Sequence, residues 1–263
     1  MFDTHCHLQD ERLRPALDAV LQRAAGAGVT AVLCCGSAET DWAAVRDLAQ
    51  RYPAILPAYG LHPWYVMERT PAWLDTLRTL LETPAAAVGE IGLDHALDPS
   101  TFEAQEEVFL AQIRLAAARH LPVSLHCRRT WGRLMELLDR QGWPPDGIVL
   151  HSYSGGKDLV PALARRGAFF SFSGAITHDR NMRGREAVAV VPADRLLIET
   201  DAPDLPAALP NGTVALRDTD GRVLSEPAHL AQVTAAVAAL RGTTPSETAE
   251  LTQHNAIQIF KRA

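Results

Sequence analysis

The sequence predicts a (β/α)8 barrel, an α/β fold in which each of eight parallel strands is followed by a helix. Apolar runs of strand length alternate with segments of helical periodicity. The expected strands end at His7, Gly36, His62, Glu90, His126, His151, Gly174 and Asp201. Successive ends lie 23 to 36 residues apart, about the length of one strand and one helix. Eight such units close into a barrel, whereas a doubly wound sheet would keep the first and last strands apart.

The strands are recognised as short apolar runs that end in glycine or in a polar residue. Residues 29–35 are typical, because a continuous apolar run of this length is buried on both faces, as in a parallel sheet. In the first strand, His5 and His7 stand two residues apart and therefore project from the same face. The eight expected strands are residues 1–7, 29–35, 55–61, 85–89, 122–125, 148–150, 168–173 and 196–199.

The helices are recognised by apolar positions that recur every three or four residues. In residues 13–27, Leu17, Val20 and Ala24 form one such stripe, and Gly28 marks its end. The eight expected helices are residues 13–27, 39–52, 71–82, 102–120, 131–141, 158–166, 226–241 and 246–260.

Two irregular segments are expected on the face of the barrel where the strands end. Residues 202–224 are rich in proline and contain Asn211-Gly212, and we expect them to form a lid or a wall of the substrate site. Residues 179–185 are expected to form a loop that carries Arg180, Arg183 and Arg185. Such a loop could hold a nucleic-acid backbone, although a solvated polar loop is the default interpretation.

Composition narrows the class of protein. The 263 residues, 47% of them hydrophobic, suit a single large domain over residues 1–263. A net charge of −6 argues against bulk electrostatic binding of nucleic acid or anionic membranes, so any polyanionic substrate must be held locally. The four cysteines form no C-x-x-C pair, which argues against structural zinc and a disulfide framework. We expect a cytoplasmic protein without a signal peptide or membrane span.

Six residues with ligand chemistry stand at the predicted strand ends. Neutral imidazoles bind transition metals, but His5 and His7 alone cannot complete a coordination sphere. The full set is His5, His7, Glu90, His126, His151 and Asp201. Four imidazoles and two carboxylates are too many for one ion, so two divalent ions are expected, with Glu90 placed to bridge them. The metal could be Mg, Mn or Zn.

Each of these residues also has a structural interpretation. Glu90 could pair with an arginine inside the barrel, and Asp201 could cap a helix. His126 and His151, each at the end of an apolar strand, could be hydrogen-bonded core residues, although their recurrence on successive strands argues against coincidence. His62 is expected to contact the substrate or to support the metal site, against the alternative that it orients the turn at Pro63.

Motifs in this order resemble the TatD family of metal-dependent hydrolases, within the amidohydrolase-like barrels. The matching segments are residues 3–7 (DTHCH), 60–63 (GLHP), 89–94 (GEIGLD), 126–128 (HCR), 151–155 (HSYSG), 199–203 (ETDAP) and 254–256 (HNA). The resemblance implies a two-metal deoxyribonuclease or related phosphodiesterase. It places His5, His7 and Asp201 on one ion, His126 and His151 on the other, and Glu90 on both.

The sequence departs from the family pattern after the eighth strand. Asp204 stands where the family usually has an aromatic residue, and residues 223–227 (VLSEP) stand where it has Arg-Asn-Glu-Pro. These positions belong to the expected substrate wall. The departures therefore bear on substrate preference and leave the expected metal ligands intact.

The predicted function is hydrolysis of DNA phosphodiester bonds, in single-stranded or damaged DNA, by a monomeric enzyme. Asp201 is expected to orient the attacking water and take its proton, and Arg128 to contact phosphate, unless it instead pairs with a carboxylate nearby. Two other hydrolase functions are alternatives: an amidohydrolase cleaving a C–N bond in a small molecule, and a D-aminoacyl-tRNA deacylase. A metal-binding protein without catalysis is a distant third.

Overall fold

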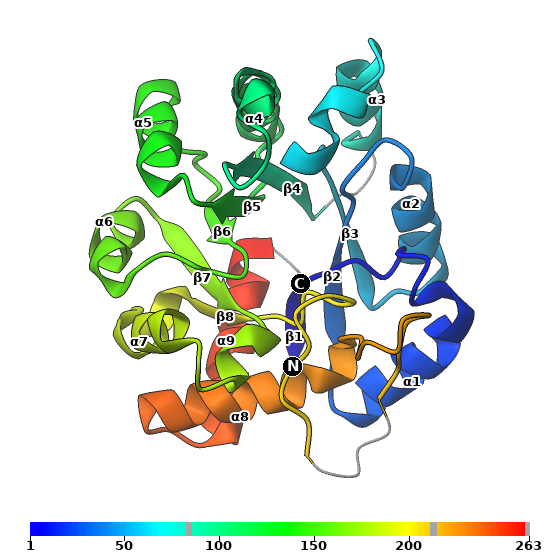
Figure 1. Cartoon of the computed structure of the whole chain (residues 1–263), viewed down its shortest axis with the longest axis vertical. Helices are drawn as coiled ribbons and strands as arrows, with labels where there is room; N and C mark the ends of the chain where they lie inside the picture. The colour runs from blue at the N-terminus through cyan, green and yellow to red at the C-terminus, as the bar shows by residue number, and fades with distance from the viewer. Residues whose placement is uncertain (83–85, 211–214, 261–263) are drawn as a thin grey trace.

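The structure, a computed structural model, describes residues 1–82, 86–210 and 215–260. Its eight strands form one parallel sheet in chain order, and helices surround them (Figure 1). The strands are β1 (Phe2–Cys6), β2 (Ala31–Cys35), β3 (Ile55–Tyr59), β4 (Ala87–Asp94), β5 (Val123–Arg128), β6 (Ile148–Leu150), β7 (Ala168–Phe172) and β8 (Leu196–Ile198). The strand order confirms the predicted (β/α)8 barrel and excludes the doubly wound alternative.

The first and last strands meet at a seam that is held by individual hydrogen bonds. The backbone N–H of Asp201 donates to the carbonyl of His5 (3.0 Å), and the N–H of His7 donates to the carbonyl of Ala202 (2.7 Å). Inside the seam, the Thr4 hydroxyl donates to the Ile198 carbonyl at 2.9 Å. These bonds bring the end of β1 beside the segment that follows β8, as barrel closure requires.

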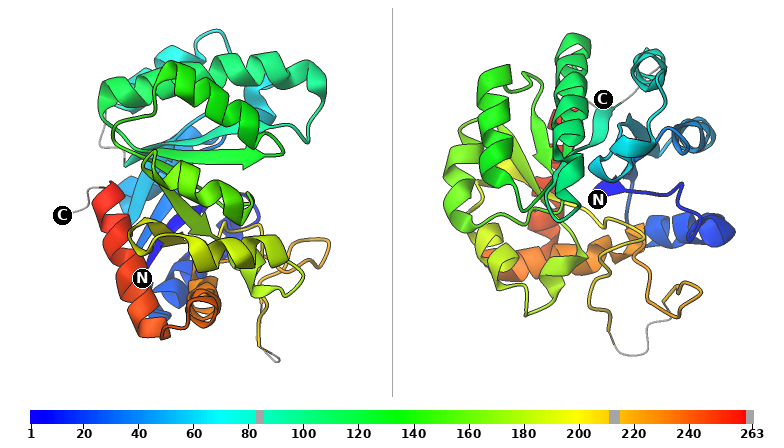
Figure 2. Two further views of the ribbon diagram at one scale, coloured as in Figure 1. Left: turned by 90° about the vertical axis from the view of Figure 1, so that its left-hand side faces the viewer. Right: turned by 45° about the horizontal axis from the view of Figure 1, so that its top comes forward.

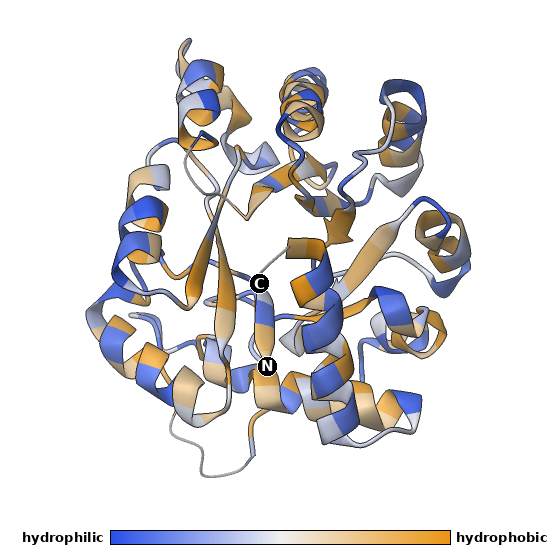
Figure 3. Ribbon diagram, turned by 180° about the vertical axis from the view of Figure 1, so that it is seen from behind, coloured by the Kyte–Doolittle hydropathy of each residue, from blue (hydrophilic) through white to orange (hydrophobic). Residues whose placement is uncertain are grey.

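The core has two layers, because side chains alternate along each strand. One face packs residues such as Leu33, Ala58 and Val149 inside the barrel, and the other packs Val32, Val88 and similar residues against the helices. Figure 3 shows apolar strands inside a ring of helices that mix apolar and polar positions.

The described helices are α1 (Leu17–Gly26), α2 (Trp42–Arg51), α3 (Trp73–Leu80), α4 (Phe102–Arg119), α5 (Trp131–Gln141), α6 (Val160–Ala164), α7 (Met182–Val190), α8 (Leu230–Arg241) and α9 (Pro245–Phe260). Helices α1 to α8 cover the outer face of the sheet in the order in which they follow the strands, and α9 lies at one end of the barrel. No described helix is long and apolar enough to cross a membrane.

The final helix, α9, covers the end of the barrel at which the strands begin (Figure 2). The ring of Phe260 packs against Phe2 of β1, with 5.6 Å between centroids. The Asn255 side chain donates to the carbonyls of Ala193 (2.7 Å) and Leu196 (2.9 Å), just before and at the start of β8. One polar side chain thus fixes α9 to the seam strand.

The structure corrects several predicted boundaries. Short 3-10 turns at Arg14–Ala16, Lys157–Leu159 and Pro227–His229 precede α1, α6 and α8, which are therefore shorter than predicted. β4 continues to Asp94, beyond the predicted end at Gly89. The predicted loop 179–185 is wrong in its second half, because α7 begins at Met182. Residues 83–85 at the start of the fourth predicted strand and Asn211-Gly212 lie outside the described residues.

Candidate metal centre

The Glu90 side chain lies near the carboxyl ends of the strands and is surrounded by histidine rings. Only 3% of Glu90 is exposed. Its Oε2 atom lies 3.3 Å from Nε2 of His5 and 3.3 Å from Nε2 of His7. Its Oε1 atom lies 3.1 Å from Nδ1 of His126 and 3.0 Å from Nε2 of His151. Each oxygen of one carboxylate therefore faces a different pair of histidines, and Oε1 also contacts His62, described below.

Asp201 reaches the same centre from the seam, on the side of the β1 histidines. Its Oδ1 atom lies 3.8 Å from Nε2 of His5 and 3.7 Å from Nε2 of His7. The backbone bond from Asp201 to His5 described above fixes this approach. The structure thus brings all six predicted ligand residues to one place. His5, His7 and Asp201 lie on one side of Glu90, and His126 and His151 lie on the other.

Two glycines allow the strands to come this close around Glu90. Gly92 has φ +153°, and a Cβ atom there would collide with the carbonyl of His126. A Cβ atom at Gly60 would lie 2.7 Å from the carbonyl oxygen of Glu90. Glycine is thus required on both sides of Glu90, which explains the spacing in residues 89–94 and 60–63.

The outward-facing ring nitrogens determine which inward-facing nitrogens carry lone pairs. His7 Nδ1 lies 2.8 Å from the Cys35 carbonyl, which can only accept, so Nδ1 carries the hydrogen. His126 Nε2 lies 3.3 Å from Asp94 Oδ2, and His151 Nδ1 lies 3.2 Å from Glu199 Oε1. In the neutral rings, the nitrogens that face Glu90 are therefore free to act as metal ligands.

His62 has the opposite arrangement. Its Nδ1 atom accepts a hydrogen bond from the backbone N–H of Trp64 at 3.1 Å, so the hydrogen of the neutral ring lies on Nε2. That Nε2 atom is 3.3 Å from Glu90 Oε1 and donates to it. His62 therefore supports Glu90 and also orients the turn at Pro63, and its contact with substrate stays a prediction.

The donor set fits divalent cations. Lone pairs of His7, His126 and His151 point at the oxygens of Glu90, and such a meeting of acceptors is repulsive unless positive charge lies among them. Imidazole nitrogens and carboxylate oxygens are the ligands used by Zn, Mn and related ions. The residues present thus suit metal binding on both sides of Glu90.

The pKa shifts of the cluster show the same demand for positive charge, which protons on the histidines supply until a cation displaces them. Burial opposes ionisation of Glu90, but the surrounding histidines hold its pKa well below the usual value. Burial lowers the pKa of His7, yet the hydrogen bond and charge of Glu90 outweigh it and raise that pKa to about 9. Burial raises the pKa of Asp201 to about 7. An ionised Glu90 in a buried site therefore favours positive charge beside it.

Sequence reasoning missed the carboxylates that orient the histidines. Asp94 is fully buried, and burial opposes its ionisation, but hydrogen bonds from His126 and Trp64 lower its pKa. Glu199 is fully buried beside His151, and its Oε2 atom has no hydrogen-bond partner among the described residues. Both residues stood in quoted motifs, and their positions at strand ends were the available signal. Such partners fix ring orientation and raise the basicity of metal ligands.

Of the predicted substrate-binding arginines, Arg128 contacts a residue of this centre, whereas the three arginines of residues 179–185 contact none of its residues in the described part of the chain. Arg128 is about half exposed (54%), and its Nη1 atom is 3.9 Å from Asp94 Oδ2, so the predicted ion-pair alternative is also realised. Arg185 donates to the Ile176 carbonyl and pairs with Asp179. Arg180 and Arg183 are exposed.

An ion cluster at the rim includes Asp204, which stands where the family usually has an aromatic residue. Arg12 donates to both carboxylate oxygens of Asp10 and to both of Asp204. Asp204 therefore ties the start of the 202–224 segment to the loop after β1.

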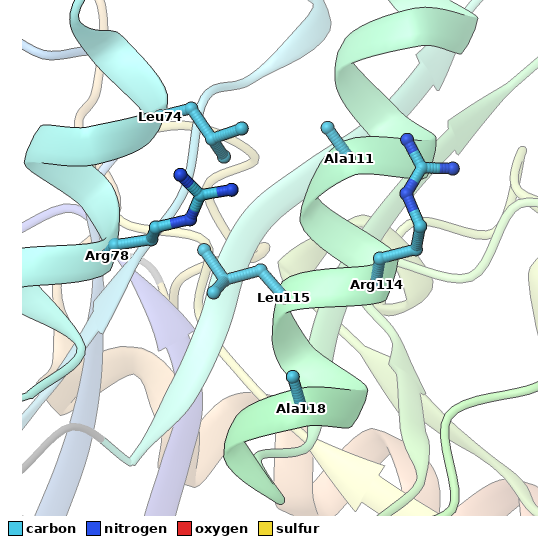
Figure 4. A pocket seen from close by; sticks show the side chains of 6 residues that line it. All are labelled: Leu74, Arg78, Ala111, Arg114, Leu115 and Ala118. Carbon is cyan, nitrogen blue, oxygen red and sulfur yellow. The ribbon is translucent and has the colours of Figure 1, made fainter.

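A separate hollow lies between α3 and α4 on the outer wall and includes none of the metal-centre residues (Figure 4). It is lined by Leu74, Arg78, Ala111, Arg114, Leu115 and Ala118.

Comparison with known proteins decides the family. The sequence model of the family described as TatD related DNase matches residues 2–261. The chain belongs to the TatD family. This TatD-family chain is 34% identical over 263 residues to the 3'-5' ssDNA/RNA exonuclease TatD of Salmonella typhimurium, covering 99% of each protein. It is 34% identical over 261 residues to the uncharacterized metal-dependent hydrolase YjjV of Escherichia coli K12, covering 98% of this chain and 96% of YjjV.

Solved structures agree with this membership. The crystal structure of E. coli YjjV matches the TatD-family chain with a TM-score of 0.90 and 33% identity, covering 100% of this chain and 98% of YjjV. A hydrolase of the TatD family from Entamoeba histolytica shares the fold, with a TM-score of 0.87 and 21% identity over 98% of this chain and 97% of that one. The predicted TatD-type metal-dependent hydrolase acting on ester bonds is thus confirmed, with candidate metal-binding clusters of histidine and glutamate.

Proposed function

We propose that this chain is a TatD-type nuclease that hydrolyses phosphodiester bonds in DNA with two divalent cations held on either side of Glu90. One observation carries the proposal: the two oxygens of Glu90 face two separate groups of imidazole nitrogens. His5 and His7, with Asp201, would hold one cation, and His126 and His151 the other. Divalent cations supply Lewis acidity, which lowers the pKa of water and neutralises charge on phosphoryl oxygens.

The residues of the chain position the reacting groups. Asp201 directs Oδ1 towards the β1 histidines, which leaves its second oxygen to orient a water molecule and accept its proton. Arg128, half exposed beside Asp94, offers a planar fork of donors to a phosphate group. His62 and the buried carboxylates hold the ring orientations, so that little rearrangement is needed when substrate binds.

The nucleic-acid substrate is supported by relatives. The Salmonella relative is named as an exonuclease that acts on single-stranded DNA and RNA. We propose single-stranded nucleic acid as the substrate class of this chain as well. Cleavage of a C–N bond or of D-aminoacyl-tRNA would be chemically within reach of such a centre, but no contact among the described residues favours either.

A direct assay tests the proposal. Protein loaded with Mg, Mn or Zn is incubated with single-stranded DNA, an abasic duplex and cyclic amides, and we expect turnover of the DNA substrates alone. Asp201→Asn should lower kcat by at least about 100-fold while most bound metal is retained, as measured by elemental analysis. Asp158→Asn, at an exposed position before α6, is the matched control. An active Asp201→Asn variant would remove Asp201 from its proposed role, and hydrolysis of amides alone would refute the nuclease.

Three further expectations stay predictions. They are that residues 1–263 form a single domain, that the protein is a monomer, and that it works in the cytoplasm. Size-exclusion chromatography with light scattering checks the second.

A further inference from the structure

Trp64 has an exposed apolar ring beside the metal centre that the fold does not explain. It lies in the 3-10 helix Pro63–Glu68, shortly after the end of β3, and 52% of it is exposed. Among the exposed large hydrophobic residues in the described part of the chain, it is the one aromatic side chain. Tryptophan is enriched at binding surfaces, because its ring offers a large apolar face and a polar N–H at one edge.

The ring of Trp64 is held in a fixed orientation. Its Nε1–H donates to Asp94 Oδ2 at 2.8 Å. Its ring meets that of His62 edge to face, with centroids 5.1 Å apart and an interplanar angle of 87°. Both neighbours are themselves fixed by contacts to the centre. The exposed face of Trp64 is therefore a rigid platform, and little entropy is lost when a ligand packs on it.

The position of this platform is set by Asp94. The same Oδ2 atom of Asp94 lies 3.3 Å from His126 Nε2 and 3.9 Å from Arg128 Nη1. Trp64 is therefore separated from a metal-facing histidine by one carboxylate, and an arginine stands beside the same carboxylate. A flat apolar surface and a cation next to a hydrolytic centre match the two parts of a nucleotide, its base and its phosphate.

We infer that Trp64 stacks on an unpaired nucleobase next to the scissile phosphate, while Arg128 contacts phosphate beside it. The inference rests on the proposed nuclease function and deepens it. Every base has a flat face, so stacking tolerates any sequence and does not distinguish DNA from RNA. A base inside a duplex already stacks on its neighbours and cannot use the platform. The substrate class is therefore single-stranded nucleic acid, or unpaired ends, of either sugar.

Trp64 could instead serve only as a buttress that positions Asp94, and the two roles predict different results. A stacking role depends on the presence of a base in the substrate, whereas a buttress affects every substrate alike. The variants Trp64→Ala and Trp64→Phe separate them, because phenylalanine keeps a stacking face and loses the Nε1 donor. Met67→Ala, on the same 3-10 helix and 63% exposed, is the matched control.

The kinetic test compares a short oligothymidylate with the same oligomer carrying abasic residues at both ends. For the metal-loaded wild type and Met67→Ala, we expect KM to be about 10-fold lower for the base-bearing oligomer. Trp64→Ala should abolish this preference, and Trp64→Phe should keep most of it. An unchanged preference in Trp64→Ala, or none in the wild type, overturns the inference.

A binding test keeps this result separate from failure of the nuclease proposal. Oligothymidylate is added to metal-free protein, and the tryptophan fluorescence of the wild type is compared with that of Trp64→Phe. We expect quenching in the wild type that is largely lost in Trp64→Phe. If this difference appears without any DNA hydrolysis, the platform stands and the nuclease proposal fails. If hydrolysis occurs without the difference, the platform is refuted and the nuclease stands.

Discussion

At the residue scale, Glu90 organises the centre because its two oxygens receive histidine rings that arrive from four different strands. The direction of each ring is set by what lies behind it: a carbonyl behind His7, and carboxylates behind His126 and His151. His62 differs because a backbone N–H lies behind it, which places its hydrogen on the side of Glu90. His62 and His126 thus lie at nearly equal distances from Glu90, but His62 donates a hydrogen bond to it whereas His126 presents a lone pair.

This difference gives a testable contrast between His62 and His126. His126→Ala removes a lone pair, and we expect metal affinity to fall by about 10- to 100-fold or more. His62→Ala removes a donor to Glu90, so metal content should be retained while kcat falls by about 10-fold or more. Metal titration by calorimetry and steady-state kinetics measure the two effects. His254→Ala, at an exposed position on α9, serves as the control.

Equal loss of metal in the His62 and His126 variants would contradict the assignment. It would mean that the His62 hydrogen lies on Nδ1 and that His62 is itself a ligand. Neutron diffraction or NMR of the ring nitrogens would then show the His62 hydrogen on Nδ1 instead of Nε2.

At the scale of elements, the barrel depends on how α9 is attached to the end at which the strands begin. Asn255 supplies two hydrogen bonds to carbonyls around the start of β8, and Phe260 packs on Phe2 of β1. α9 thus contacts both strands of the seam, where hydrogen bonds from the short β8 are few.

We therefore expect Asn255→Ala to be destabilising. It leaves two carbonyl groups without their donor in a buried setting, and the free energy of unfolding should fall by about 1–3 kcal/mol. Urea denaturation followed by circular dichroism measures this. The neighbouring variant His254→Ala removes an exposed hydrogen bond to Gln258 and should change stability by less than about 0.5 kcal/mol. Equal stability of the two variants would show that α9 is not fixed through Asn255.

Element boundaries also show where sequence reasoning reached its limit. The strands were predictable because runs such as residues 29–35 are apolar on both faces. α7 was missed because only Gly184, Ala187 and Val188 of its nine residues are buried, which is too short a stripe to reveal a helical period. The predicted helices begin too early at α1, α6 and α8, where Pro15, Pro161 and Pro227 favour tighter turns or helix starts.

At the scale of the whole molecule, the candidate site was predictable where the order of the strands alone determines which residues lie together. In a barrel, every strand ends at the same rim, so His5 and Asp201 could be placed together from spacing alone. The partners behind the ligands could not, because Asp94 and Glu199 are recognised only once ring directions are known. The exposure of Trp64 could not either, since side-chain accessibility depends on the loops that surround it.

The cysteines provide a prediction for the folded molecule as a whole. All four are free and buried, and burial raises the pKa of Cys34 from 9.0 to about 12. A thiol whose folded pKa is raised stabilises the protein fully below the unfolded pKa. That contribution is lost as the pH rises from about 9 towards 12. We therefore expect the urea midpoint to decline in this alkaline range.

Reactivity towards a thiol reagent checks the same claim at neutral pH. The native protein should react hardly at all with Ellman's reagent, whereas all four thiols of the unfolded protein should react with it. Rapid modification of a native thiol would contradict the burial described here. Cys6→Ser and Cys34→Ser variants would then identify which strand is accessible.

The seam between β1 and β8 has a consequence for how the enzyme becomes active during its synthesis. His5 and His7 are translated long before Asp201, the residue that completes their side of the proposed centre. A nascent chain that lacks Asp201 therefore lacks part of the proposed metal centre. We expect hydrolytic activity to appear only once β1 has met the segment that follows β8.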